Sequence, residues 1–176
     1  MTLRFANADE ALRFFDSLDV VGADAMLGAW RGEEVASGHP LDGALAAYGW
    51  KGKRFDDAER VHPLVFEAGA RQFPVRPRWI LPGVPLLLRW PALKKPAVAH
   101  IVRLLLPVLA TRRPRARLRM LQFRGRLSAA MLYDEVPIVD VFRRIDEDTV
   151  LGLMDLKGME PPYFFLLRRE PPHAMR

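Results

Sequence analysis

Two residues capable of acid–base chemistry lie close together in the first third of the chain. His39 and Asp42 are three positions apart in the segment SGHPLDG. An imidazole beside a carboxylate can exchange protons with a substrate near neutral pH. The chain has no cysteine, and no GxSxG-type turn presents a nucleophilic serine. An enzyme that uses His39 and Asp42 is therefore one hypothesis, without a nominated substrate, and a structural role for the pair stays open.

Metal and cofactor sites are not expected from the histidines. The four histidines are scattered, without the HxH or HExxH spacing that brings ligands together. A haem-binding barrel would need a histidine near its last strands, and the chain offers His173 there, in a proline-rich tail. We therefore expect no metal and no cofactor.

A second group of polar residues lies in the last third of the chain, where it could hold the head of a ligand. Asp140 interrupts the apolar run IVDVF and precedes Arg143. It is either a solvated, salt-bridged residue or a buried carboxylate paired with an arginine, which would mark a pocket. Arginine and tyrosine side chains bind anionic heads through charge-assisted hydrogen bonds. The candidate ligand-binding residues are Arg124, Arg126, Tyr133, Asp140 and Tyr163. If the strand over 117–133 points its apolar residues inward, Tyr133 faces the interior while Arg124 and Arg126 face out, and which of its faces points inward stays open.

The segment GAWRG places Trp30 between Gly28 and Gly32. Glycine in a strand lets a large ring or another backbone approach closely. We expect Trp30 to lie across one end of a barrel as a plug, with an arginine of the last strand, Arg168 or Arg169, stacked on it. Contact between Trp30 and a ligand is the alternative.

The elements that would position these residues are mainly strands. A helix is expected over 7–18, where Asn7 caps and apolar residues recur at helical spacing. A second helix begins near Pro96 and breaks near Pro107, and a short helical turn ends at Gly49. Apolar and polar residues alternate over 117–133, which predicts one long strand with Gly125 as a bulge or bend. Further strands are expected over 26–36, 49–55, 61–67, 71–79 (suited only to an edge), 136–145, 150–156 and 163–169.

Two stretches resemble known families. Residues 24–67, from DAMLGAWRGEEVASGHPLDG onward, resemble the family named for the GXWXG motif. Residues 124–169, from RGRLSAAMLYDEVPIVDVFRRI to PYFFLLRR, resemble the domain of unknown function that commonly follows it. The GxW pattern with a late arginine is also similar to lipocalin-type barrels, which implies a barrel that holds a small apolar ligand.

The positive charge is concentrated in one block. Residues 71–126 hold fourteen Lys or Arg and no Asp or Glu, although the whole chain has a net charge of only +6. Such a block marks either a solvated insert or a surface that faces a polyanion. Apolar residues and two tryptophans are mixed among the bases, which favours an anionic membrane over nucleic acid. Residues 112–126 are the candidate for a nucleic-acid contact, but they lack stacking aromatics.

These patterns predict a single α+β, mainly β, domain over 1–176: a small antiparallel β-barrel with an N-terminal helix and a helical insert. The GXWXG region would span 24–67, the basic apolar insert 71–116, and an antiparallel meander 117–169. The expected function is binding of a small hydrophobic, anionic ligand such as a fatty acid or lipid. The absence of cysteine and of an apolar signal segment fits a cytoplasmic protein, with peripheral membrane contact left open.

Overall fold

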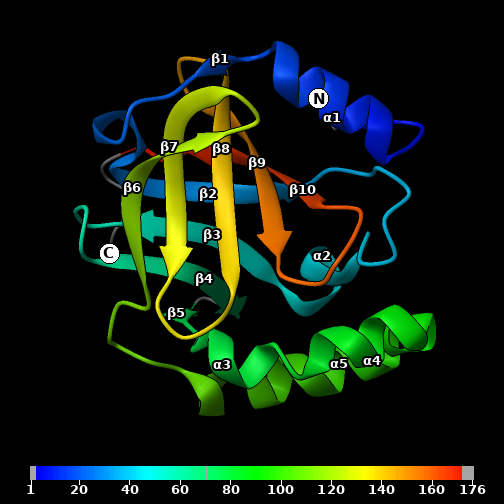
Figure 1. The fold of residues 1–176 in the computed structure, drawn as a ribbon. Helices are drawn as coiled ribbons and strands as arrows, with labels where there is room; N and C mark the ends of the chain where they lie inside the picture. Colours follow the sequence, from blue (N-terminus) through cyan, green and yellow to red (C-terminus); the bar gives the residue numbers. More distant parts are fainter. Residues whose placement is uncertain (1–2, 70, 172–176) are drawn as a thin grey trace.

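A closed eight-stranded antiparallel barrel forms the centre of the molecule (Figure 1). The computed structural model describes residues 3–69 and 71–171. Each barrel strand pairs with its neighbour along the chain, and the last strand pairs with the first. The strands are β2 (Gly28–Glu34), β3 (Trp50–Phe55), β4 (Val61–Ala68), β6 (Ala116–Phe123), β7 (Arg126–Tyr133), β8 (Ile138–Asp146), β9 (Thr149–Leu156) and β10 (Tyr163–Arg169). The expected fold class is confirmed.

Two short strands lie outside the closed ring. β1 (Asp19–Val20) pairs with β8. β5 (Arg71–Pro74) pairs with β4 alone, so its proline does not interrupt a central ladder. The expected edge strand is confirmed over 71–74, whereas its extension to residue 79 was wrong, because helix α3 begins at Pro77.

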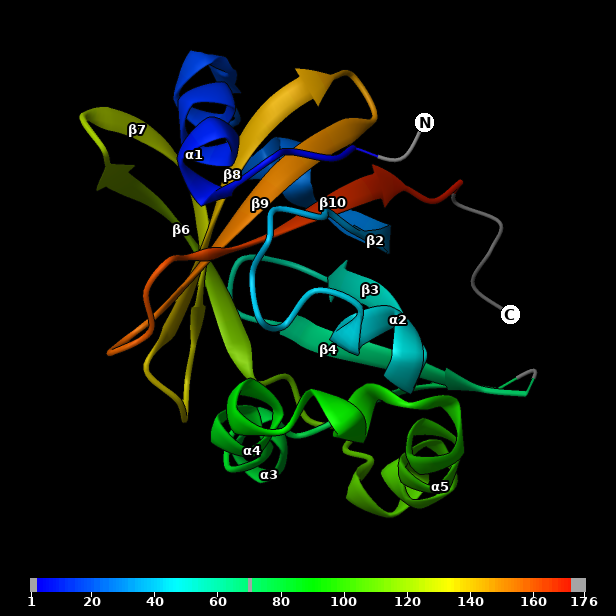
Figure 2. The ribbon, with the colours of Figure 1, turned by 90° about the vertical axis from the view of Figure 1, so that its right-hand side faces the viewer.

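Helix α1 (Ala8–Ser17) covers the outside of the barrel (Figure 2). Asn7 caps it, because its side chain accepts a hydrogen bond from the backbone of Glu10. Phe15 is fully buried against outward-facing residues of β7 to β10, including Phe164. The barrel therefore has two apolar clusters, one inside the ring and one between its outer face and α1.

A layer of short helices lies across the end of the barrel opposite α1 (Figures 1 and 2). We call residues 77–109 the helical layer. It contains α3 (Pro77–Ile80), α4 (Gly83–Arg89), η2 (Pro91–Lys94), α5 (Pro96–Leu105) and η3 (Leu106–Leu109). Helix α2 (Ala44–Tyr48) packs beside it and ends, as expected, at Gly49 in a left-handed conformation. In the described part of the chain, no helix combines the length and apolarity needed to cross a bilayer.

The alternation over 117–133 belongs to two strands rather than one. Arg124 and Gly125 both have positive φ and form the two-residue turn between β6 and β7. The turn changes which residues face inward. Phe123 on β6 points outward to the α1 cluster, whereas Met131 and Tyr133 on β7 point into the barrel. The prediction of a single strand with a bulge at Gly125 was wrong, because apolar residues line both faces of this hairpin.

Candidate functional site

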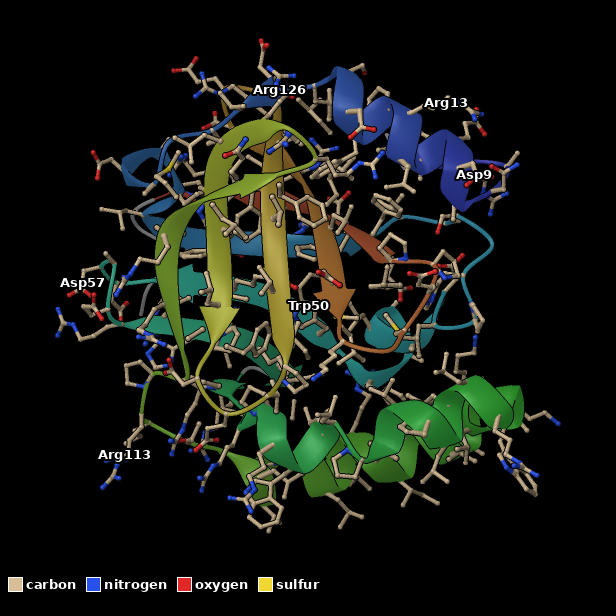
Figure 3. The ribbon with its side chains drawn as sticks, in the orientation of Figure 1. Asp9, Arg13, Trp50, Asp57, Arg113 and Arg126 are labelled. Atoms are coloured by element: carbon tan, nitrogen blue, oxygen red, sulfur yellow. The ribbon has the colours of Figure 1, made fainter. Side chains whose placement is uncertain are left out.

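A cavity of about 120 Å³ lies between the barrel interior and the helical layer. Its wall comes from β3, β4, β7, β8, β9 and β10, and its cover comes from α2, α3 and α4. The wall is almost entirely apolar and includes Trp50, Phe66 and Phe165. In Figure 3, Trp50 lies inside the ring of strands, above the helical layer. The fold therefore builds one sheltered apolar chamber at this end of the barrel.

A bulge in β3 turns a lysine into this chamber. The pairing of β3 with β4 shifts its register on both sides of Gly52, so the usual alternation breaks. Trp50 and Lys53 consequently both face inward, while Lys51 lies outside beside Glu67. Gly52 has φ +146°, and a Cβ there would lie 1.9 Å from the carbonyl oxygen of Trp30. Only glycine fits, so the sequence WKGK is what places Lys53 in the barrel.

Lys53, Asp140 and Tyr133 form a buried polar cluster on the cavity wall. The Lys53 Nζ lies 2.8 Å from Asp140 Oδ2 and 3.4 Å from the Tyr133 hydroxyl. Nζ also donates to the carbonyl oxygen of Pro63, at 3.0 Å. The Tyr133 hydroxyl donates to Asp140 Oδ2 at 3.3 Å. The exposed fractions of the Lys53 and Asp140 side chains are 3% and 1%, so water does not screen this ion pair.

Burial shifts the titration of all three groups toward their neutral forms. Loss of solvation lowers the pKa of Lys53, although the adjacent Asp140 carboxylate opposes the shift. The same desolvation raises the pKa of Asp140 against the influence of Lys53. It also raises the pKa of Tyr133 well above its ordinary value. Movement of a proton from Lys53 to Asp140 therefore costs less here than in water.

Two buried polar atoms of the cavity-lining residues have no hydrogen-bond partner within the described residues. They are Oδ1 of Asp140, an acceptor, and Nε1 of Trp50, a donor. A buried polar atom left without a partner costs about 1–3 kcal/mol. Such atoms mark positions where a bound molecule can supply the missing hydrogen bonds.

The opposite rim of the cavity holds a second polar pair. The Tyr163 hydroxyl donates to Glu34 Oε1 at 3.0 Å, and the same oxygen accepts from the backbone of Leu45. Desolvation raises the pKa of Glu34. These contacts fasten α2 to the barrel where it covers the cavity. Three of the five residues expected to bind a ligand thus line the cavity: Tyr133, Asp140 and Tyr163.

Arg124 and Arg126 lie elsewhere, at the turn between β6 and β7. Arg124 forms a two-pronged ion pair with Asp16 of α1, at 2.8 and 2.6 Å. Arg126 donates to the carbonyl oxygen of Leu18 at 2.6 Å. In Figure 3, Arg126 lies at the far end of the barrel from the helical layer. The expectation that these arginines face a ligand inside the barrel was wrong, because the turn directs them to α1.

His39 and Asp42 do not pair with one another through their side chains. The Nδ1 of His39 accepts from the backbone of Leu41, and Nε2 lies 3.1 Å from the carbonyl oxygen of Pro161. Asp42 Oδ2 accepts from the backbone of Ser37 and of His39. Desolvation lowers the pKa of His39, which keeps the ring neutral. Both ring nitrogens are occupied by backbone groups, so this arrangement fixes a loop and leaves no nitrogen for acid–base work.

The end of the barrel away from the cavity is filled by Trp30. This side chain is 2% exposed, and its Nε1 donates to the carbonyl oxygen of Met26 at 2.8 Å. The Arg169 guanidinium lies 4.3 Å from the ring centroid and donates to the carbonyl oxygens of Leu27 and Ala25. Arg168 instead contacts Glu33 and Thr149. Of the two arginines expected to stack on Trp30, it is Arg169 that does so.

Two family models match this chain, one over each half of the barrel. Residues 13–70 match the family model of GXWXG proteins, and residues 114–169 match a domain of unknown function, DUF4334. A crystal structure of a protein from Thermomonospora curvata is 31% identical, with a TM-score of 0.68. The match covers 96% of this chain and 90% of that one. This chain belongs to the GXWXG family. Among curated proteins, none matches it.

The GXWXG motif connects the two ends of the barrel. Gly28 adopts φ +111°, beside the Arg169 guanidinium. A Cβ at Gly32 would lie 2.2 Å from the ring of Trp50. This glycine therefore makes room for Trp50, whereas the sequence had suggested that it makes room for Trp30. The first glycine therefore serves the filled end, and the second serves the cavity.

Lys53 is the site residue of this GXWXG protein that sequence reasoning missed. A lysine within an alternating strand is ordinarily placed on the solvent face. The one available signal was Gly52, since an isolated glycine in a strand often marks a bulge that reverses the alternation. Asp140 is buried, as one of the two hypotheses required, but its partner is Lys53 rather than an arginine. In the described ranges, no group of His, Asp and Glu is arranged to hold a metal ion.

Proposed function

We propose that the barrel binds a small, apolar and uncharged molecule in the cavity beside Lys53. The observation that supports it is an apolar chamber lined by two residues that each have a buried polar atom without a partner, the acceptor Oδ1 of Asp140 and the donor Nε1 of Trp50. A hydroxyl or a similar group can supply both missing hydrogen bonds. Lys53 is already neutralised by Asp140, so the cavity offers no spare charge for the anionic head expected from the sequence.

The size of the chamber limits the ligand. An apolar cavity of about 150 Å³ holds one benzene ring, and this cavity is about 120 Å³. A five-membered ring or a short branched chain fits. A whole fatty acid would require the helical layer to move, so the chamber would receive only the tip of such a chain.

Binding can be tested by calorimetry with cyclopentanol as the probe. We expect saturable binding at one site and a rise in melting temperature with ligand concentration. Ala44→Leu, which extends into the cavity from α2, should abolish binding. Ala46→Leu places the same side chain on the exposed face of α2 and serves as the matched control. Equal binding by both variants, or none by the unmodified protein, would contradict the proposal.

The helical layer supports a second part of the proposal, contact with an anionic membrane from which the ligand is taken up. Its outer face exposes large apolar side chains that project away from the barrel (Figure 3). Trp79 is 57% exposed, Trp90 58% and Val108 81%. Basic residues accompany them: Arg78, Arg89, Lys95 and Arg103 in the layer, and Arg112 and Arg113 just after it, are all exposed. Apolar side chains that insert beside cations suit the boundary of an anionic bilayer.

Most of the other arginines of the basic block form ion pairs with carboxylates from elsewhere in the fold. Arg76 and Arg115 pair with Glu135, Arg117 with Asp134, Arg119 with Glu59, and Arg124 with Asp16. Most of the arginines between 112 and 126 are therefore occupied, which weakens the nucleic-acid alternative. The layer keeps its charge where its apolar side chains are exposed, and this combination favours lipid.

Vesicle sedimentation tests the membrane contact. We expect binding to vesicles that contain phosphatidylglycerol, and weaker binding to pure phosphatidylcholine. The double change Trp79→Ser with Trp90→Ser should weaken binding about tenfold, equivalent to about 1.4 kcal/mol. Leu127→Ser removes a side chain that is 56% exposed at the opposite end of the barrel and should have no effect. Equal binding to both vesicle types would count against this part of the proposal.

A further inference from the structure

We propose that Lys53 reacts covalently with a small apolar ketone or aldehyde in the cavity, forming an iminium ion at Nζ. The inference rests on the proposed function, because the carbonyl compound must first occupy the chamber beside Lys53. It adds to that function a chemical class of ligand, a carbonyl compound, and a reactive atom.

The position of Nζ is the first support. The Gly52 bulge carries the lysine into the ring of strands, where its side chain lines the apolar cavity. Nζ lies 4.7 Å from the ring centroid of Phe165 and 5.6 Å from that of Trp50. Desolvation in this apolar chamber leaves more of the Lys53 amine in the neutral, nucleophilic form, although the ring faces themselves favour the ammonium. Nothing in the barrel architecture requires a lysine here, since replacing a buried ion pair by apolar residues is often neutral or stabilising.

Asp140 supplies the second support, a proton shuttle at hydrogen-bond distance. Its Oδ2 lies 2.8 Å from Nζ, and its Oδ1 is free of partners among the described residues. The carboxyl group can therefore take the proton of the ammonium and still present an oxygen to a reacting group. The Tyr133 hydroxyl donates to Oδ2 and positions the carboxyl group.

The reaction balances without any further reagent. A proton moves from Nζ to Asp140, and the freed lone pair forms a C–N bond with the carbonyl carbon while the C=O π electrons move to oxygen. The oxygen takes the proton from Asp140. Asp140 then removes one proton from the nitrogen and donates it to the hydroxyl oxygen, so that the C–O bond breaks and water leaves. In sum, the Lys53 ammonium and one carbonyl compound yield one iminium ion and one water. The new cation keeps Asp140 as its counter-ion.

The experiment uses the full-length protein with cyclopentanone and sodium cyanoborohydride, which reduces an iminium ion to a stable secondary amine. Peptide mass spectrometry then locates the added mass. We expect modification at Lys53 to exceed that at Lys51 by about tenfold or more, because the cavity holds the ketone against Nζ of Lys53 whereas Lys51 meets it only from solution. Lys51 is the internal control, because it lies two residues away on the same strand but outside the barrel. Lys53→Met should abolish the adduct, and Lys51→Met should leave it unchanged.

Cyclopentanol separates this inference from the proposed function, because it fits the same chamber but cannot form an iminium ion. If the alcohol binds and the ketone leaves no adduct on Lys53, the covalent step is wrong and the binding function stands. If neither compound binds or reacts, both are wrong. If Lys53→Met does not fold, the ratio of modification at Lys53 and Lys51 in the unmodified protein still decides. Equal modification of the two lysines would overturn the inference.

Discussion

Each end of the barrel brings a tryptophan together with a basic side chain, and the two pairs differ in how completely their polar atoms are satisfied. At the filled end, Trp30 donates to a carbonyl oxygen, and Arg169 donates to two more while it stacks on the ring. At the cavity end, Trp50 Nε1 has no partner within the described residues. Lys53 forms an ion pair with Asp140, whose second carboxylate oxygen is also without a partner there. The same residue types thus close one end and leave the other chemically incomplete.

The difference shows how a structural pair can be told from a candidate site. Arg169 is a strong donor that meets backbone acceptors at the surface, so it has no need of a ligand. Lys53 is buried with its partner, where the loss of solvation of both charges can exceed their mutual attraction. An ion pair whose burial costs solvation free energy, and which lies beside an apolar cavity, is therefore a candidate for a functional site.

Gly52 contacts the strand of Trp30 and also forms the bulge that places Lys53. We therefore expect its substitution to have the largest effect on stability. Gly52→Ala places a Cβ 1.9 Å from the Trp30 carbonyl oxygen, which disturbs the strand of Trp30 and the bulge of Lys53 together. We expect a loss of at least about 4 kcal/mol in the free energy of unfolding, measured by urea denaturation. Gly43→Ala is the control, because Gly43 also has a positive φ but open space around it. That change should cost about 1–2 kcal/mol. Similar losses for both glycines would show that backbone strain, and not the close contact, sets the cost.

At the cavity end, Asp140→Ala should follow in size. It leaves the Lys53 ammonium buried without a counter-ion, and breaking such a pair costs about 3–5 kcal/mol. The double change Lys53→Met with Asp140→Leu removes both charges and should recover most of the loss. A double variant that is as unstable as Asp140→Ala alone would show that the ion pair stabilises the fold relative to apolar residues at the same positions.

At the filled end, Arg169→Met should cost less. Its stacking on Trp30 and its hydrogen bonds to two carbonyl oxygens together contribute about 1–3 kcal/mol. Arg31→Met, on the neighbouring strand β2, removes an arginine whose side chain is 58% exposed and should change stability by less than about 0.5 kcal/mol. The melting temperatures of the two variants give the comparison. Equal decreases in melting temperature would show that the contacts of Arg169 with Trp30 and the two carbonyl oxygens do not stabilise the fold.

The smallest expected effect is on the pH dependence of stability, at the rim of the cavity. Desolvation places the pKa of His39 in the folded chain below the value of about 6.5 in the unfolded chain. As the pH falls below that value, the unfolded chain takes up a proton that the folded chain refuses, so stability is full above it and declines below it. We expect the free energy of unfolding to decline between pH 7 and pH 5 relative to His39→Asn, as measured by urea denaturation at each pH. His62, whose pKa is also lowered, contributes equally to both proteins and cancels. If the unmodified protein gains stability relative to His39→Asn as the pH falls, this explanation is wrong.

The fold could be predicted from the sequence because its signals are local. Alternating residues and polar turns define most of the strands, and neighbouring strands in the chain are neighbours in the barrel. Asn7 and Gly49 mark a helix start and a helix end. The inward orientation of Tyr133 followed from the alternation of β7 alone.

The candidate site was less accessible, because it depends on two departures from alternation. The two-residue turn at Arg124 and Gly125 exchanges the inner and outer faces between β6 and β7, and alternation from the inward Tyr133 leaves Arg126 on the outside. The bulge at Gly52 moved Lys53 to the inside. The pairing of Lys53 with Asp140 joins side chains 87 positions apart on strands that are not neighbours in the ring. No local pattern could have indicated that contact.

One ladder pair, between Val61 and Ala116, joins β4 to β6 across the point where the helical layer leaves the barrel. The helical layer in this connection contains no strand, so it can lengthen, shorten or be replaced without shifting the register of the ladders on either side of it, including that of β4 with β5. The two family models end at residue 70 and resume at residue 114, so they flank this same segment. The architecture thus separates a barrel constrained by its ladders and glycines from a cover that can change its contacts with a ligand independently of them.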